Sequence, residues 1–183
     1  INKLPSTDKA RVLHFHVDGE NKAAQLNNAL NKMNTHLEKS DPEKTFLVVY
    51  DADSRPDLNV FTEADAVAFE YMEASAMQQP SVYFDNYKNI PYGLAGEYLK
   101  SRPLYNLRFC LFREIPGYAR SIRFRNSSKF IKFLLGSPNH FIGHGEFIRL
   151  SAFKTTTMHF PEPSADTSLG TILSFFGNRS IGF

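Results

Sequence analysis

The segment Phe46–Asp53, with the sequence F-L-V-V-Y-D-A-D, is the feature that most limits what this chain can fold into. Its apolar, β-branched part is typical of a short buried strand in a parallel sheet, where both faces are covered. Side chains two residues apart point to the same side of an extended chain, so Asp51 and Asp53 can share one target. Hard cations prefer oxygen ligands, and ligands of open α/β sheets bind at the carboxyl ends of strands. We therefore expect a Mg2+ or Mn2+ site here; the alternative is a polar exit from the strand.

The length and composition of the chain are those of an ordinary globular protein. Its 183 residues are enough for one domain with a substantial core, and 42% of them are hydrophobic. The formal net charge of +2 is too small to indicate a polyanionic partner. The single cysteine, Cys110, excludes an internal disulfide and fits a reducing compartment. The sequence contains no signal-peptide pattern and no apolar run long enough to span a membrane. We expect a single domain over residues 1–183, itself a fragment of a longer protein, in the cytoplasm or as the cytoplasmic domain of a membrane-associated protein.

Apolar periodicity and turn residues predict alternating strands and helices. Helices are predicted over residues 23–37, 62–77, 94–112 and 167–176. Strands are predicted over residues 11–17, 46–49 and 81–84, and further apolar segments lie at 130–135 and 147–153. Pro103 is expected to kink or divide the third helix. This order predicts an α/β fold in which helices flank a mostly parallel sheet.

Five short motifs follow one another along the chain. They are K-A-A-Q-L-N at 22–27, D-A-D at 51–53, Q-Q-P at 78–80, G-H-G with a following arginine at 143–149, and A-D-T-S-L-G at 165–170. In this order and spacing they resemble the motifs of the family-2 glycosyltransferases, over roughly residues 22–177. The resemblance implies a GT-A fold. The family's first strand, in the nucleotide-binding half, has no counterpart before Lys22, so we expect a GT-A-like domain that is incomplete at its N-terminus.

The resemblance also implies a role for each matching residue. Asp53 would bind the divalent metal, and Asp166 would be the general base that deprotonates the acceptor hydroxyl. The donor-binding residues would be Lys22, Asp51, Gln79 and Arg149, and the residues on the acceptor side would be Gly143 and Gly145. The implied activity is metal-dependent, inverting transfer of a sugar from a nucleotide-sugar donor to a glycan or lipid-linked acceptor, as in polysaccharide biosynthesis.

Each of these residues also has a simpler structural explanation that the sequence leaves open. Asp166 fits a helix cap, and Lys22 fits a solvated residue in the first turn of a helix. Gln79 fits a loop hydrogen bond, and the two glycines fit a need for backbone freedom. Arg149 fits an ion pair with a nearby carboxylate as well as with a diphosphate. Ala165 stands where the family has a glutamate, so this motif is half present.

The region between Lys100 and Lys132 contains nine basic residues and one acidic residue, Glu114, with aromatic residues interleaved. Such a surface suits an anionic membrane, at about 1 kcal/mol for each nearby Lys or Arg, or a solvated face over a packed core. Nucleic acid is not an expected partner, because no recognition motif for it is present. The second function class is therefore a non-catalytic GT-A-like binding or scaffold module that docks on an anionic membrane surface.

Overall fold

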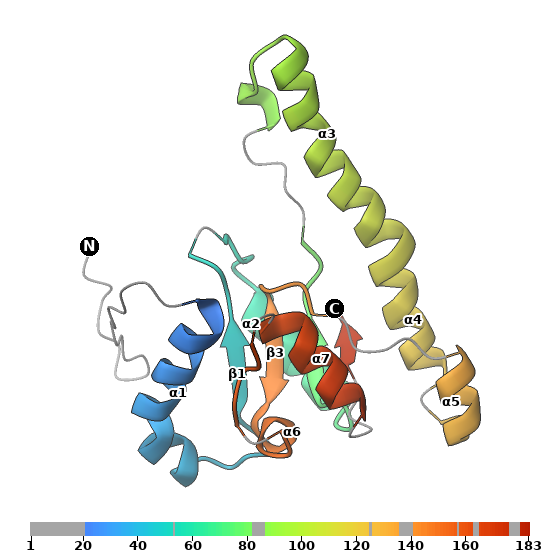
Figure 1. The fold of residues 1–183 in the computed structure, drawn as a ribbon. Coiled ribbons are helices and arrows are strands. Elements are labelled where there is room, and N and C mark those ends of the chain that lie inside the picture. The colour runs from blue at the N-terminus through green and yellow to red at the C-terminus, as the bar shows by residue number, and fades with distance from the viewer. Residues whose placement is uncertain are drawn as a thin grey trace.

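In the computed structural model, a small mixed sheet lies between two groups of helices (Figure 1). The structure describes residues 21–52, 54–81, 87–124, 126–135, 141–156, 158–162, 165–175 and 180–183. The elements are α1 (Lys22–Lys39), β1 (Phe46–Val49), α2 (Val60–Glu70), β2 (Ala76–Gln78), η1 (Tyr87–Asn89), α3 (Leu94–Phe109), η2 (Cys110–Glu114), α4 (Ile115–Arg123), α5 (Lys129–Leu135), β3 (Glu146–Arg149), α6 (Leu150–Lys154), α7 (Ala165–Phe175) and β4 (Ser180–Gly182). The predicted α/β class is confirmed.

The prediction of a mostly parallel sheet is wrong. The strand order is β1-β3-β2-β4, in which β3 is antiparallel to both of its neighbours and β2 is parallel to β4. The cause is topological: Gln78 at the end of β2 pairs with Glu146 at the start of β3. The segment 79–145 therefore leaves and re-enters the sheet at one end, and the two strands must run in opposite directions.

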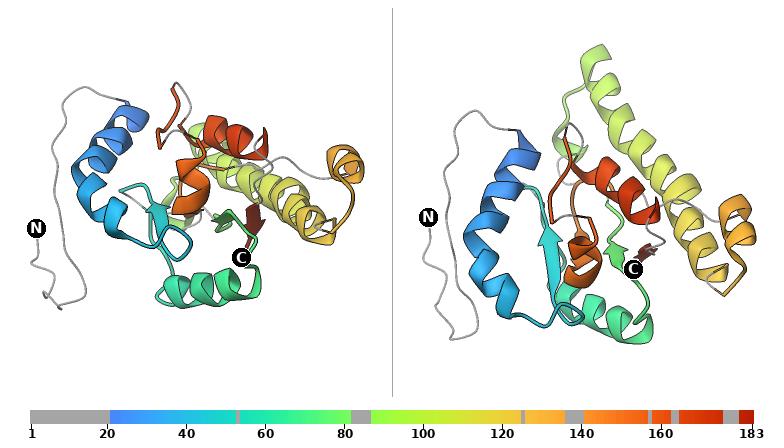
Figure 2. Two further views of the ribbon diagram at one scale, coloured as in Figure 1. Left: turned by 90° about the horizontal axis from the view of Figure 1, so that it is seen from below. Right: turned by 60° about the horizontal axis from the view of Figure 1, so that its bottom comes forward.

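The apolar run that suggested a strand buried on both faces belongs to an edge strand of the described sheet. Along β1 the side chains alternate between more and less buried, and Val48 is 37% exposed. The strands buried along their whole length are β3 and β2, and β3 lies between β1 and β2. Its successive side chains point to opposite faces of the sheet. Ile148 packs against residues of α1, α6 and α7, whereas Phe147 packs against residues of α2 and β4. Figure 2 shows α2 on one side of the sheet and α1, α6 and α7 on the other.

The predicted helices are confirmed in outline, with informative differences at their ends. The predicted helix over 62–77 begins earlier, at Val60, and ends at Glu70. Residues Ala76–Gln78 instead form β2 and are completely buried, so the second strand lies earlier than the predicted 81–84, of which residues 82–84 are outside the described part. Three residues are too few for a period of two to be distinguished from a helical stripe. The predicted strand over 11–17 also lies outside the described residues.

The predicted helix over 94–112 is part of a longer helical segment that runs from Leu94 to Arg123. Pro103 lies inside α3 and does not divide it. The helix continues through the π-helical turn η2 into α4. Figure 1 shows this segment projecting well beyond the sheet. Among the described residues, no helix combines the length and the apolar character needed to cross a bilayer.

The packing of β3 gives a direct test of the core. Ile148 is 0% exposed and lies in the larger of the two hydrophobic clusters. Replacing it (Ile148→Ala) should lower the free energy of unfolding by about 2–5 kcal/mol, because it leaves a cavity at the centre of the sheet. Val48→Ala, at a partly exposed site on the neighbouring strand, should cost about 1 kcal/mol or less. Urea denaturation measures both values, and equal losses would contradict the assignment of β3 as the central strand.

Candidate functional site

Three chain segments meet at one end of the sheet because of the direction of its strands. Asp51 follows β1, Gln79 follows β2, and the loop Gly143–Gly145 leads into β3. The pairs Val49↔Glu146 and Gln78↔Glu146 place these segments side by side. The carboxyl ends of β1 and β2 thus adjoin the amino end of β3, and polar residues from distant parts of the sequence gather there.

Lys22 joins the first helix to this end of the sheet. Its ammonium group donates a hydrogen bond to Asp51 Oδ1 over 2.8 Å and another to the carbonyl of Gly143. Asn21 is the N-cap of α1, and its side chain accepts the backbone N–H of Ala24 over 2.9 Å. The cap positions the first turn, since it satisfies a donor that the helix leaves unpaired. Lys22 is therefore more than a solvated residue of the first turn.

Asp166, in the first turn of α7, also lies at this end of the sheet, next to Gly143. Its Oδ1 accepts the backbone N–H of Thr167 over 2.9 Å, and the positive end of the helix dipole favours its negative charge. Its Oδ2 faces Gly143 so closely that a Cβ atom at this position would overlap it, and the same Cβ would lie 3.2 Å from Lys22 Nζ. Gly143 also has a φ of +89°, which glycine adopts without strain. Asp51 and Asp166 are therefore on the same side of the molecule, as the predicted site requires.

Gln79 and Gly145 form a second close contact in this cluster. The backbone N–H of Gln79 donates to the carbonyl of Gly145 over 2.9 Å, and a Cβ on Gly145 would lie 3.0 Å from Gln79 Cβ. Gly145 has a φ of +64°. The side chain of Gln79 accepts the Tyr50 hydroxyl over 2.7 Å. Gln79 therefore lies at the site, with its amide oxygen bound by the residue that precedes Asp51.

Gln78 is a buried residue of the site whose importance the sequence analysis missed. Its amide nitrogen donates to the carbonyls of Gln79 and His144 over 2.9 and 2.8 Å, and its Oε1 accepts the N–H of Ile142 over 3.3 Å. One side chain thus binds the loop before β3 at two points. The Q-x-P motif drew attention to this dipeptide, but nothing in the sequence showed that Gln78 points inward.

His144 is a second missed residue. Its Nδ1 lies 3.8 Å from Asp51 Oδ2, and its Nε2 is hydrogen-bonded to the Ser81 hydroxyl. The ring therefore connects the carboxylate at the end of β1 with the segment after β2. A histidine between two glycines gave no periodic signal, so this position could not be found without the strand register.

Glu146 is a buried carboxyl group between these residues, and it too was missed. It is 1% exposed and accepts the N–H of Gly143 over 2.8 Å. Burial raises the pKa of the Glu146 carboxyl to about 7, the charges of Asp166 and Asp51 act in the same direction, and the Gly143 N–H and Lys22 oppose them. The cluster therefore contains a group that titrates near neutral pH.

Arg149 is a predicted site residue that the structure does not bring into the cluster. Arg149 lies at the opposite end of β3, where its Nε donates to the carbonyl of Ala74 over 3.0 Å and its Nη1 to the carbonyl of Glu43. Its guanidinium lies 4.7 Å from the centre of the Phe46 ring. The prediction that Arg149 binds the donor is therefore wrong. Its guanidinium is bound by backbone carbonyls and not by the carboxylate that was the alternative partner. Asp53 lies outside the described residues.

The predicted metal ligand, Asp53, is outside the described residues, so the fit of a divalent cation can be examined only on the others. Within the described part of the chain, no group of three or more His, Cys, Asp and Glu side chains has the arrangement needed to hold a metal ion. Asp51 Oδ1 is already bound by Lys22, and its Oδ2 faces His144. The described residues alone therefore do not fit the expected cation, and Mg2+ or Mn2+ binding stays a prediction.

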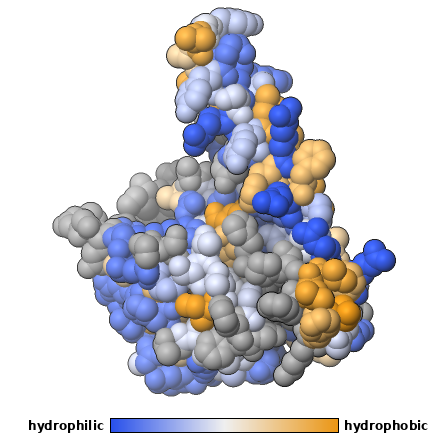
Figure 3. Space-filling model, turned by 45° about the vertical axis from the view of Figure 1, so that its right-hand side comes forward, coloured by the Kyte–Doolittle hydropathy of each residue, from blue (hydrophilic) through white to orange (hydrophobic). Residues whose placement is uncertain are grey.

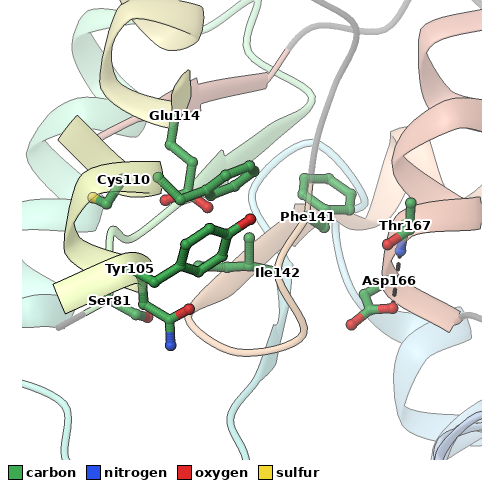
Figure 4. Close-up of a pocket in the computed structure, with 10 residues that line it drawn as sticks. Ser81, Tyr105, Cys110, Glu114, Phe141, Ile142, Asp166 and Thr167 are labelled. Atoms are coloured by element: carbon green, nitrogen blue, oxygen red, sulfur yellow. Dashed lines mark hydrogen bonds between the residues drawn. The ribbon is translucent and has the colours of Figure 1, made fainter. Parts of the chain in front are cut away.

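A pocket of about 340 Å3 opens beside Asp166 (Figure 4). Its lining residues are Ser81, Tyr105, Asn106, Phe109, Cys110, Glu114, Phe141, Ile142, Asp166 and Thr167. Figure 4 shows Tyr105, Cys110 and Glu114 on one wall, Asp166 and Thr167 on the opposite wall, and Phe141 and Ile142 between them. The site therefore combines a polar cluster around Lys22 with a neighbouring cavity, and Asp166 belongs to both.

Comparison of the chain with protein-family models, with curated proteins and with solved structures found no match. The resemblance to the family-2 glycosyltransferases consequently stays a prediction.

The titration of Glu146 can be measured through the stability of the protein. Its pKa rises from 4.5 to about 7 on folding, so its contribution to stability is fully present below pH 4.5 and is lost as the pH rises through 7. Glu146→Gln mimics the neutral acid. Relative to the unaltered protein, this variant should gain about 3 kcal/mol in free energy of unfolding between about pH 5 and about pH 8.

Urea denaturation across this pH range tests the prediction, with Glu70→Gln as the control because Glu70 is exposed at the end of α2. If the curves of the two variants run parallel to that of the unaltered protein, Glu146 does not titrate near neutral pH.

Proposed function

We propose that this chain is the sugar-transfer part of an inverting glycosyltransferase that uses a nucleotide-sugar donor. The observation that carries the proposal is the contact of Lys22 with Asp51 and Gly143, with Asp166 against the same glycine. These four residues come from the start of α1, the end of β1, the loop before β3 and the start of α7. A cation, two carboxylates and a glycine with positive φ, all from distant segments, have no evident purpose as packing.

The proposed reaction needs a base on one side of the anomeric carbon and a positive group on the other. The Asp166 carboxylate accepts the proton of the acceptor hydroxyl as its oxygen bonds to the anomeric carbon. At the same time the bond from that carbon to the diphosphate oxygen breaks, and the electron pair leaves on the diphosphate. In this proposal Lys22 binds the resulting negative charge, which needs electrostatic stabilisation in the transition state. A divalent cation, held through Asp53 with Asp51 near the nucleotide, would add to that stabilisation.

Donor binding and transfer are separable in this scheme. Calorimetric titration with uridine diphosphate and Mn2+ should give a metal-dependent signal. Lys22→Gln should weaken binding about tenfold or more through loss of a cation that contacts the diphosphate. Asp166→Asn should leave uridine diphosphate binding unchanged and should abolish sugar transfer, because an amide cannot accept the proton.

The matched control is Lys39→Gln, at the far end of the same helix, which should bind like the unaltered protein. Absence of a metal-dependent signal in the unaltered protein, or an equal loss in both lysine variants, would refute the proposed donor site.

A second candidate function, membrane docking without catalysis, is favoured by the projecting segment Leu94–Arg123. It contains six basic residues and two acidic ones. Of the acidic residues, Glu114 is buried and Glu97 pairs with Lys100 at 3.2 Å. Exposed apolar side chains accompany the basic residues, among them Tyr98, Leu104, Leu111 and Phe112. Figure 3 shows apolar and hydrophilic residues interspersed along this projection, and a further apolar patch near α5. An anionic bilayer surface matches both the charge and the exposed apolar groups.

Vesicle sedimentation tests this second candidate. The protein should bind vesicles of phosphatidylcholine with phosphatidylserine more tightly than vesicles of phosphatidylcholine alone, and added salt should weaken the binding. Phe112, 74% exposed on η2, should contribute by insertion, so Phe112→Ser should reduce binding about tenfold or more. Phe69→Ser, at an equally exposed site on α2, should have no effect. Equal binding to both kinds of vesicle would rule out docking through charge.

A further inference from the structure

The pocket beside Asp166 differs in chemistry from the cluster around Lys22. We infer that it binds the acceptor, and that the acceptor is an uncharged pyranose sugar whose ring lies against Tyr105. The inference rests on the proposed function, in which Asp166 receives the acceptor's proton. It names the acceptor's chemical class, which the motifs left open between a glycan and a lipid-linked acceptor.

The aromatic lining is suited to the apolar face of a sugar ring. Tyr105 is 67% exposed, and Figure 4 shows its ring at the pocket, with its hydroxyl towards the interior. Phe109 also lines the pocket, and the buried Phe141 separates the two walls. Aromatic rings offer a large, rigid apolar surface at low entropic cost. A pyranose presents several C–H groups on one face, and such a face packs well on an exposed tyrosine ring.

The polar lining supplies partners for sugar hydroxyl groups. Asn106 can both donate and accept hydrogen bonds, and the hydroxyls of Ser81 and Thr167 can do either. Asp166 accepts only, and it stands on the wall opposite Tyr105. A sugar ring resting on Tyr105 would therefore direct a hydroxyl at its edge towards the group that removes the proton. A volume of about 340 Å3 lies at the lower end of the range for small-molecule sites, which suits a ligand of one or two rings.

The charge of the pocket favours a neutral acceptor over a phosphorylated one. Among the residues that the structure describes, the charged ones that line it are the acids Glu114 and Asp166, with no lysine or arginine. Burial, followed by the charge of Glu114 and a hydrogen bond to it, raises the pKa of the Cys110 thiol, which therefore stays protonated beside that carboxylate. A lipid phosphate in this cavity would meet negative charge on two walls. The positive group, Lys22, lies in the neighbouring cluster, where the proposed reaction needs it for the diphosphate.

The π-helical turn explains how one helix lines the pocket over three turns. Asn106, Cys110 and Glu114 are spaced four residues apart and all line the cavity. In a regular α-helix each such step rotates the side chain by about 40°, so the third residue would turn away. The wider turn Cys110–Glu114 holds more residues and reduces that rotation. Single π-helical turns of this kind are frequent at functional sites.

Saturation-transfer NMR with small ligands tests the inference on the whole chain. The probes are the methyl β-glycosides of glucose, galactose and N-acetylglucosamine, with glycerol 3-phosphate as the phosphorylated probe, all in the presence of uridine diphosphate and Mg2+. At least one glycoside should receive saturation at its ring C–H protons. Tyr105→Ala should weaken its binding about tenfold, and Tyr105→Phe should retain it because the aromatic surface remains.

Tyr98→Ala is the matched control, since Tyr98 is exposed on the same helix and does not line the pocket. No saturation of any glycoside would overturn the inference, and so would binding of glycerol 3-phosphate alone. Equal losses in Tyr98→Ala and Tyr105→Ala would also overturn it.

Titration with uridine diphosphate and Mn2+ separates the two proposals. Nucleotide binding without glycoside binding refutes only the acceptor site, and glycoside binding without nucleotide binding refutes only the donor site.

Discussion

The ammonium group of Lys22 is the contact on which the rest of the site depends. It holds Asp51 at the end of β1 and the carbonyl of Gly143 in the loop before β3, and so connects α1 with two strands. These two hydrogen bonds hold the Lys22 side chain over this end of the sheet. Without it, the carboxyl groups of Asp51, Asp166 and Glu146 would lose the ammonium charge that now lies beside them. Burial raises the pKa of the Glu146 carboxyl and the charges of Asp166 and Asp51 raise it further, whereas the charge of Lys22 opposes them.

Buried polar side chains that the sequence did not single out hold the loop of the site in place. Gln78 holds the glycine loop through its amide, and Glu146 accepts the N–H of Gly143. Both point to the face of the sheet on which α1 and α7 lie, because Gln78 and Glu146 are paired across strands. A buried amide and a buried acid are costly unless they are hydrogen-bonded. Their cost is offset here by hydrogen bonds to carbonyl and N–H groups of the loop, which help to fix the positions of Gly143 and Gly145.

Features that depend on local pattern were predictable from the sequence, and features that depend on strand direction were not. The apolar stripe of α1, the short apolar run of β1 and the position of α7 all follow from the residues within each segment. The gathering of Lys22, Asp51, Gln79, Gly143, Gly145 and Asp166 at one end of the sheet agrees with the order of the motifs. The antiparallel course of β3 could not be read from its four residues. That course sends Arg149 to the far end of the sheet, which is why its expected role failed.

The projecting helix combines two surfaces that make different physical demands. Near the sheet, Asn106, Cys110 and Glu114 face a cavity that is closed by Phe141 and Asp166, and this lining is acidic. On the same segment, Leu111 and Phe112 are exposed to solvent, and Arg108 and Arg113 are close to them in the sequence. That surface is basic. A helix can carry both, because residues three or four apart share a face whereas their neighbours do not. Docking of the basic surface on an anionic bilayer would therefore leave the acidic pocket facing another direction. In that arrangement the proposed sugar acceptor would reach Asp166 from solution, so membrane docking and sugar transfer are physically compatible in one chain.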